Sequence, residues 1–497
     1  MGGGVGWRHG LAALGLTLLA LALRLPRLLE TPGWDPDEGY NLEIAWQLLH
    51  GRAQAFAVSQ SFVQHPVLFY ALLAPLLALA GKELLVARAL VAVVGALAVG
   101  VLYLAVRSSA GTRAAVLAAV TLAGAHFVVL HGRLAYTYNL LLLWAALSLW
   151  FVTRWEQTRA LRWLLGTVIA AALGLLSDQV GLALPMFVAA RVLPRRRLAL
   201  GVLGASVAPA VLAALAMAIV EPGASARDWA KSLLRVVVET PGLSGGPATR
   251  LALWFVNYLH LLRAEWWLPL AVAGLFCVRD LTGRRRVLTL AGLTALPVFA
   301  LRDLEPFFRT GIPLFVPAAV GIGALLDAGL GLVFRSVPGR PARVGAAALV
   351  IALPLGLELA RSAGAAATSF QTRFDWALVT DQRSARETAT YVNFQVRTGD
   401  VILVSPHVAW LYDARAVDFF QAVAWTGESI AFYPAGLSRA RFKFEPSVER
   451  ARFAAIDPFW RQWVEVSVAL AQLTARIEQW PEVYRAGEIS VRRNPAA

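Results

Sequence analysis

The stretch GWDPDEGYNLEIAWQLLHG, residues 33–51, decides the fold because it interrupts a very apolar chain at its first membrane boundary. It follows an apolar run, Leu11–Leu23, and it places Asp35, Asp37 and Glu38 within four positions. Charged side chains at a membrane edge are costly unless they are solvated, paired or functional. Asp at an N-cap, proline next and acids in the first turn also start a helix well. The stretch therefore predicts an interfacial helix, and its acids have either a capping role or a chemical one.

Working outward, the chain is 497 residues long and 58% apolar, against roughly 45–50% in soluble proteins. Apolar runs of about 17–25 residues, the length of a membrane-crossing helix, recur along the first three quarters of the chain. We expect an α-helical polytopic membrane protein with a retained first span, since no small-residue cleavage site follows the first run. About eleven spans are predicted, at residues 11–29, 84–106, 114–131, 135–153, 162–177, 180–193, 198–220, 265–279, 287–301, 311–334 and 343–361.

The basic charges predict the orientation. The net charge of +15 comes almost entirely from the first 361 residues, so it encodes topology and does not indicate a nucleic-acid partner. Five short loops hold 17 arginines, counting Arg8, but only two acids, Glu156 and Asp280. Cytoplasmic loops carry such an excess. We expect a multi-pass protein of the plasma membrane with a cytoplasmic N-terminus and an extracytoplasmic C-terminus.

The segment HPVLFYALLAPLLALAG, residues 65–81, is short for a span and holds two prolines. If it crossed the membrane, the next basic loop would lie outside. We therefore predict a re-entrant or interfacial helix on the outer face, within a large outer loop at residues 30–83.

The chain is predicted to have two domains, a membrane module at residues 1–361 and an extracytoplasmic α/β domain at residues 362–497. ARETATYVNFQVRTGDVILVS predicts a helix, a turn and a buried strand, and FAAID and GEISVRR predict further strands. DPFWRQWVEVSVALAQLTARIEQW is typical of one amphipathic helix. The single cysteine, Cys277, excludes a disulfide framework within one chain.

Charged residues recur in the other outer segments. HGRLAYTYN, residues 131–139, offers Arg133 and Tyr136, and LRDLEPFFRTGIP, residues 301–313, offers Arg302 and Arg309. Arginines bind phosphate bidentately, and a carboxylate can act as a general base. Together with an apolar wall, these groups suit a lipid-linked phosphate and a hydroxyl that loses its proton.

These motifs resemble the start of the GT-C membrane glycosyltransferases, in particular the family 39/83 group with its protein O-mannosyltransferases and lipid A aminoarabinose transferases. Members carry an Asp-Glu pair in the first outer loop, a segment of the H/K-P-P-L-Y type, and an arginine at the start of the following span. The matching residues here are Asp37 and Glu38, His65 and Pro66, and Arg88. HGRLAYTYNLLLLWAALSLWF and FFRTGIPLFVPAAVGIGALL resemble later family segments, so the resemblance covers most of residues 11–335.

The resemblance implies a polyprenyl-phosphate-linked sugar as donor and a lipid, glycan or protein as acceptor. It implies that Asp37 first, and Glu38 second, acts as base on the acceptor or positions it. Arg88 would contact the donor phosphate or hold the acidic pair. The transfer would invert the anomeric centre, since a single displacement needs no covalent intermediate.

The sequence departs from the family pattern in three places, one of which is the second outer loop, where Tyr138 and Asn139 stand near the position of an acid that relatives often carry. Val67 replaces the second proline, and Asp178 stands where many relatives have a lysine, so Asp178 is either a second functional acid or a helix cap. The resemblance implies no cofactor, although a loose divalent cation at the three acids stays an alternative, and the histidine spacing predicts no tight metal site. The predicted substrate-binding residues are Asp35, Tyr40, His65, Arg88, Arg133, Tyr136, Asp178, Arg302 and Arg309.

Two other classes of protein stay open. A transporter or flippase of lipid-linked saccharides would place ionisable groups near the bilayer midplane, on broken helices in paired halves. The acids here gather at one face, and no half-repeat is visible. A non-catalytic membrane scaffold would bind a partner through its outer domain and would need no groove for a donor.

Overall fold

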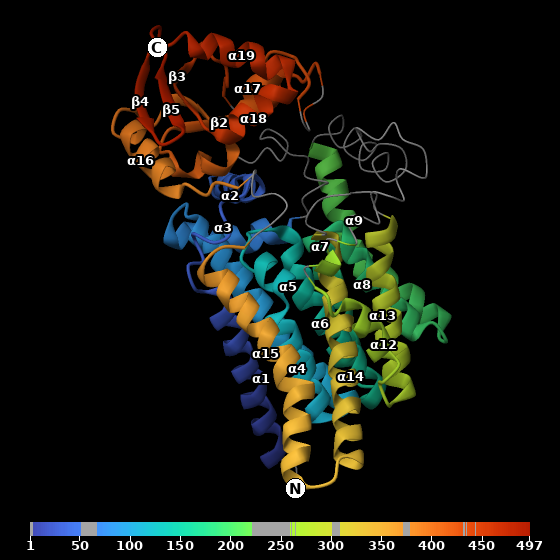
Figure 1. The fold of residues 1–497 in the computed structure, drawn as a ribbon. Coiled ribbons are helices and arrows are strands. Elements are labelled where there is room, and N and C mark those ends of the chain that lie inside the picture. Colours follow the sequence, from blue (N-terminus) through green and yellow to red (C-terminus); the bar gives the residue numbers. More distant parts are fainter. Residues whose placement is uncertain are drawn as a thin grey trace, which may run out of the picture.

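The computed structural model describes residues 3–50, 67–220, 259–300, 309–370 and 378–497, apart from positions 260, 264, 431, 432, 434 and 443. A bundle of helices carries a small α/β domain at one end, and the N-terminus lies at the opposite end (Figure 1). The predicted fold class, a helical membrane module with a C-terminal α/β domain, is confirmed.

The helices of the module follow the predicted spans. They are α1 Gly3–Arg24, α4 Leu84–Gly124, α5 His126–His131, α6 Leu141–Thr158, α7 Leu161–Ser177, α8 Ala183–Val192, α9 Arg196–Val220, α12 Leu268–Leu275, α13 Leu281–Ala300, α14 Phe315–Ser336 and α15 Arg340–Ala367, with short 3-10 turns η1 Thr137–Leu140, η2 Gln179–Leu182 and η3 Arg309–Leu314. α4 contains two predicted spans, which meet where Gly111 leaves the helical region with a φ of 87°.

Four stretches of helix among the described residues are long and apolar enough to cross a bilayer, namely Leu84–Gly124, Arg196–Ala216, Gly311–Ser336 and Arg340–Ala367. The number of eleven spans stays a prediction. α15 continues to Ala367, past the predicted domain boundary after residue 361.

The predicted cytoplasmic loops meet at one end of the module. Glu156 pairs with Arg191 at 2.7 Å and with Arg286 at 2.6 Å. The neighbouring Gln157 donates to the carbonyl of Ser108 at 2.9 Å. The α14–α15 turn lies at the end of the module that holds the N-terminus (Figure 1). The basic loops are therefore gathered in space, as a shared membrane side requires.

Two helices of the predicted outer loop at residues 30–83, α2 Pro36–Leu49 and α3 Leu68–Ala80, lie between the bundle and the C-terminal domain (Figure 1). α3 has 13 residues and contains Pro75, and it is therefore too short to cross a bilayer as a helix. Its position beside α2 agrees with the predicted interfacial helix.

The C-terminal domain is a five-stranded sheet with helices on both faces. Its elements are α16 Gln382–Asn393, β1 Val401–Val404, η5 Pro406–Leu411, β2 Arg415–Asp418, α17 Phe419–Trp425, η6 Arg439–Arg441, β3 Ala451–Ile456, α18 Pro458–Val466, α19 Val468–Glu478, β4 Glu482–Ala486 and β5 Ile489–Arg493. The strand order is β2-β1-β3-β5-β4. β1 is parallel to β2 and β3, whereas β5 is antiparallel to β3 and β4.

One prediction for this domain is wrong. The segment expected to form a single helix is divided into α18 and α19 at Ser467. Ser467 is extended, with a φ of −131°, and its side chain accepts a hydrogen bond from the backbone N–H of Leu470. A serine that caps the next helix in this way competes with continuation of the previous one.

The core of the domain is continuous with the acidic edge of the module. Ile402 and Val404 on one face of β1 belong to the same apolar cluster as Trp34, while Leu403 packs on the opposite face with Trp460. Trp34 also forms a β-bridge with Val379. The sheet is thereby fixed against the segment that starts α2.

Candidate active site at the acidic edge

The start of α2 is built by Asp35 and Glu38. The Asp35 carboxylate accepts from the backbone N–H of Asp37 at 2.9 Å, and the Glu38 carboxylate accepts from the backbone N–H of Asp35 at 3.1 Å. This reciprocal arrangement is a capping box, which satisfies donors that a helix start would otherwise leave unpaired. The capping role predicted for Asp35 is confirmed.

Glu38 also forms a fully buried ion pair with Arg88. The guanidinium contacts both carboxylate oxygens, at 2.8 and 2.6 Å, and Glu38 accepts a further bond from the backbone N–H of Ala135 at 2.8 Å. Arg88 gives its remaining donors to backbone carbonyls, including those of Pro32 and Gly33. Such a bidentate, saturated pair is structural in this conformation. Of the two roles expected for Arg88, the geometry supports holding the acid.

Arg133 is likewise fully buried. Its guanidinium donates to the carbonyls of Arg24, Pro26 and Thr31 and to the Thr31 hydroxyl. These bonds tie the end of α1 to the segment that leads into α2. A phosphate contact by Arg133 would have to displace them.

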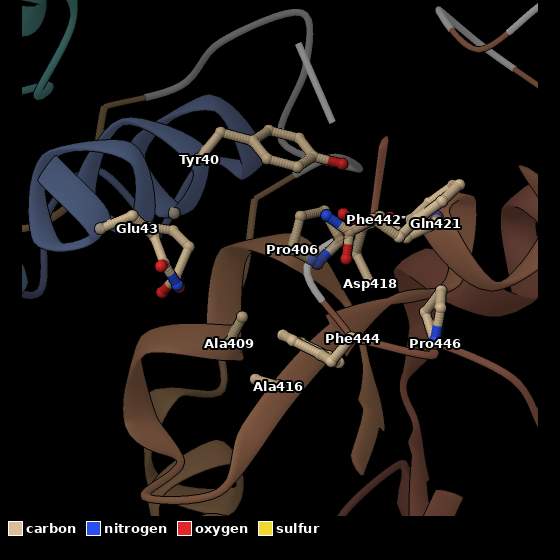
Figure 2. A pocket seen from close by; sticks show the side chains of 12 residues that line it. Tyr40, Glu43, Pro406, Ala409, Ala416, Asp418, Gln421, Phe442, Phe444 and Pro446 are labelled. Carbon is tan, nitrogen blue, oxygen red and sulfur yellow. Dashed lines mark hydrogen bonds between the residues drawn. The ribbon is translucent and has the colours of Figure 1, made fainter. Parts of the chain in front are cut away.

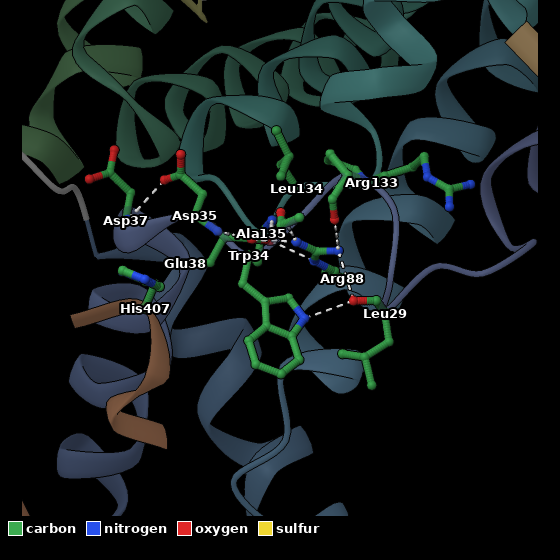
Figure 3. Close-up of polar contacts among 12 residues, drawn as sticks. Leu29, Trp34, Asp35, Asp37, Glu38, Arg88, Arg133, Leu134, Ala135 and His407 are labelled. Carbon is green, nitrogen blue, oxygen red and sulfur yellow. Dashed lines mark hydrogen bonds and ion pairs between the residues drawn. The ribbon is translucent and has the colours of Figure 1, made fainter. Parts of the chain in front are cut away.

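Asp37 lies on the other side of the same turn. Its carboxylate points away from Arg88, and Figure 3 shows the two acids diverging from one turn of α2. Burial raises the pKa of Tyr70 on α3 well above its usual range, and the negative charges of Asp37 and Asp178 raise it further. The two acids thus lie near one phenol, whose hydroxyl donates to the Asn41 side chain at 2.9 Å.

Asp178 also caps η2, because its carboxylate accepts from the backbone N–H of Val180 at 2.9 Å. Tyr136 is buried in an aromatic group with Tyr138 and His131, with ring centroids 5.1 and 6.3 Å from its own. η1, which directly follows Tyr136, contacts α3 and η3. This aromatic group therefore belongs to the same end of the bundle as α2.

Tyr40 faces the C-terminal domain. Its hydroxyl donates to the buried carboxylate of Asp418, at the end of β2. Figure 2 shows both residues at the contact between α2 and this domain. Three other predicted residues cannot be placed as side chains: His65 and Arg302 lie outside the described residues, and Arg309 is described only as the first backbone position of η3.

The three acids of residues 35–38 do not fit a shared cation site. The Asp35 carboxylate caps the helix, the Glu38 carboxylate is held by Arg88, and the Asp37 carboxylate points away from Arg88 (Figure 3). Within the described residues, no three His, Cys, Asp or Glu side chains converge as metal ligands.

Sequence reasoning missed several polar residues. Tyr70 and Asn41 had a signal in the motifs of residues 33–51 and 65–81, although neither was chosen as a site residue. Glu265 and Glu358 had no signal in the sequence. Both are buried in the module, where the Glu265 carboxylate accepts a hydrogen bond from the Trp267 indole N–H at 2.6 Å. The carboxyl groups of Glu265 and Glu358 also share a hydrogen bond. Their partners come from distant parts of the chain.

Comparison with known proteins identifies the class: the chain has the fold of the GT-C membrane glycosyltransferases. It matches ArnT from Cupriavidus metallidurans bound to undecaprenyl phosphate with a TM-score of 0.66 and 16% identity, covering 100% of this chain and 99% of that one. AglB, an oligosaccharyltransferase from Archaeoglobus fulgidus in complex with an inhibitory peptide and a dolichol-phosphate, matches with a TM-score of 0.55 and 13% identity, over 99% of this chain and 74% of that one.

At the level of sequence, the profile of the family described as dolichyl-phosphate-mannose-protein mannosyltransferase matches residues 64–225. No curated protein matches the chain. The predicted resemblance to GT-C enzymes of the mannosyltransferase and aminoarabinose transferase type is thereby confirmed.

Proposed function

We propose that the protein transfers a sugar from a polyprenyl-phosphate donor to a lipid, glycan or protein acceptor at the outer face of the plasma membrane. The fold shared along its whole length with a protein that binds undecaprenyl phosphate supports the choice of donor. The basic loops at the end opposite the C-terminal domain support the outer location.

One observation carries the proposal: the two acids of the first turn of α2, Asp37 and Glu38, have different surroundings. Glu38 is committed to Arg88, while Asp37 points away from that pair and lies near Tyr70 and Asp178. This leaves Asp37 as the carboxylate that can meet a substrate without dismantling the start of α2.

In the proposed reaction, the Asp37 carboxylate takes the proton of the acceptor hydroxyl. The acceptor oxygen then forms a bond to the anomeric carbon as the bond from that carbon to the phosphate oxygen breaks. Polyprenyl phosphate leaves with the electron pair, and the configuration inverts because there is one displacement. Tyr70 and Asp178 lie near Asp37, and Arg302 and Arg309 remain the proposed phosphate contacts.

The test is sugar transfer in proteoliposomes with a panel of polyprenyl-phosphate sugars, comparing wild type with Asp37→Asn. Asp413→Asn is the matched control, since Asp413 is exposed in the C-terminal domain. Loss of transfer in Asp37→Asn alone supports the proposal, and equal transfer in both variants contradicts the role of Asp37. Parallel assays with added Mg²⁺ and with a chelator test whether a divalent cation contributes.

A further inference from the structure

An open pocket lies at the contact between α2 and the C-terminal domain. We call it the seam pocket. Figure 2 shows Tyr40 and Glu43 of α2 on one side and Asp418, Gln421 and Phe444 of the C-terminal domain on the other. The reaction proposed above makes no use of these groups.

The lining combines three kinds of group. Carboxylates come from Glu43 and Asp418, side-chain amides come from Gln47 and Gln421, and the ring of Phe444 is half-buried. Carboxylates accept hydrogen bonds from hydroxyls, and amides can both donate and accept. An aromatic ring offers an apolar face against which the C–H face of a sugar ring can pack. A few oriented polar groups on an apolar wall are what a small-molecule site needs.

Gln47 supplies an unused acceptor. Its amide nitrogen donates to Glu43 at 2.5 Å, whereas its buried side-chain oxygen has no hydrogen-bond partner among the described residues. Leaving a buried acceptor unpaired costs free energy unless a ligand or water satisfies it. A hydroxyl donor in the pocket would do so.

The charge of the pocket limits the ligand. Glu43 is paired with Lys82 at 2.8 Å, and Asp418 is buried without a cation paired to it in the described chain. Burial raises the pKa of Asp418 to about 7, so part of this group is negative at neutral pH. A phosphate or carboxylate ligand would be repelled, while a neutral saccharide would be accepted.

α2 connects the pocket to Asp37. Tyr40 and Glu43 follow Asp37 at intervals of three residues, so the pocket begins one turn further along the helix. At about 1.5 Å per residue, Glu43 lies roughly 9 Å along the axis from Asp37. A ligand that reaches both points must be longer than a single sugar ring.

We propose that the seam pocket binds a neutral sugar residue of a glycan acceptor, at a distance from the hydroxyl that receives the transferred sugar. This inference rests on the proposed transferase function and narrows its acceptor to a saccharide-bearing molecule. Phe444, Gln47 and Asp418 would determine acceptor specificity, and Asp37 would perform the chemistry.

The experiment measures binding with the full-length protein in lipid nanodiscs and no donor, by saturation-transfer NMR. The probes are the neutral disaccharides maltose and chitobiose, with glucuronate and glucose 6-phosphate as anionic counterparts. We expect the neutral probes to bind and the anionic ones to bind at least about tenfold more weakly. Phe444→Ala should weaken neutral binding about fivefold, the range of one aromatic contact. Phe394→Ala, at a ring 92% exposed elsewhere in the domain, should change nothing.

Gln47→Leu provides a second variant that keeps the shape of the pocket. Equal binding by wild type, Phe444→Ala and Gln47→Leu would overturn the proposal, as would the absence of binding by either neutral probe. Binding needs no catalysis, so its outcome is independent of the proposed function. In the transfer assay with a glycan acceptor, Phe444→Ala should raise KM about fivefold and leave kcat unchanged. No transfer by wild type would count against the function and leave the binding result standing.

Discussion

Asp37 and Glu38 are neighbours in the sequence, yet the two sides of the first turn of α2 differ completely. Glu38 is wholly buried and saturated by Arg88, Ala135 and the capping box, whereas Asp37 is half-buried and lies near Tyr70. Successive residues on a helix point about 100° apart, because a turn takes about 3.6 residues. A pair of adjacent acids can therefore give one carboxylate to the structure and the other to the site.

The largest expected effect concerns the Asp37 side. Asp37→Asn should reduce transfer by about 10²–10⁴-fold, the usual contribution of a general base. Its apparent Tm should stay within a degree or two of wild type, because the buried pair of Glu38 with Arg88 and the capping box are both kept. Initial rates in proteoliposomes and thermal scans of the same preparations measure both quantities. A large fall in Tm would show that Asp37, like Glu38, is structural.

Substitution of Glu38 should mainly reduce stability, in contrast to substitution of Asp37, which should mainly reduce transfer. Glu38→Gln leaves the Arg88 guanidinium buried without its carboxylate, which should cost about 3–5 kcal/mol of unfolding free energy. Thermal unfolding in detergent measures the loss. Glu387→Gln, which removes an exposed pair with Arg383, is the control and should cost less than about 1 kcal/mol. If Glu38→Gln kept wild-type stability and lost transfer, the division of roles between the two acids would be reversed.

A smaller effect is expected where α2 meets the C-terminal domain. A Cβ on Gly39 would lie 2.1 Å from the carbonyl oxygen of Pro406, so the backbone itself must move. Gly39→Ala should cost about 1–3 kcal/mol, as overpacking does, and should speed amide exchange at η5. Hydrogen exchange followed by mass spectrometry measures this. Gly399→Ala, where a Cβ meets nothing within 4 Å, should leave exchange at η5 unchanged. Similar exchange in both variants would show that the domain does not depend on this contact.

The comparison also shows what a sequence can predict. The N-cap role of Asp35 was visible because a proline and two acids follow it directly, and the spans were visible because a bilayer imposes their length. The partner of Glu38 was visible only through a family motif, since Arg88 is 50 residues away. The hydrogen bond between Glu265 and Glu358 and the contact of Tyr40 with Asp418 had no signal. Tertiary packing alone brings these residues together, as it also sets the strand order of the C-terminal domain.

The smallest expected effect is a pH dependence of the stability, caused by Asp418 in the seam pocket. Burial raises the pKa of Asp418 to about 7, from its ordinary value of 3.8. Between these values the folded protein holds a proton that the unfolded chain releases, so stability falls as pH rises and levels off above pH 7. Between pH 6 and pH 8 the loss from this one group should be about 1.4 kcal/mol.

Asp418→Asn should remove that slope. Asparagine still caps α17, so the helix start is kept while the titrating group is lost. Apparent Tm measured from pH 5 to pH 8.5 should fall less steeply in the variant than in wild type, with the two curves closest at low pH. Parallel curves would mean that Asp418 ionises without cost. A negative charge on the Asp418 carboxylate would then cost no more stability than the negative charge on Glu38, which is paired with Arg88.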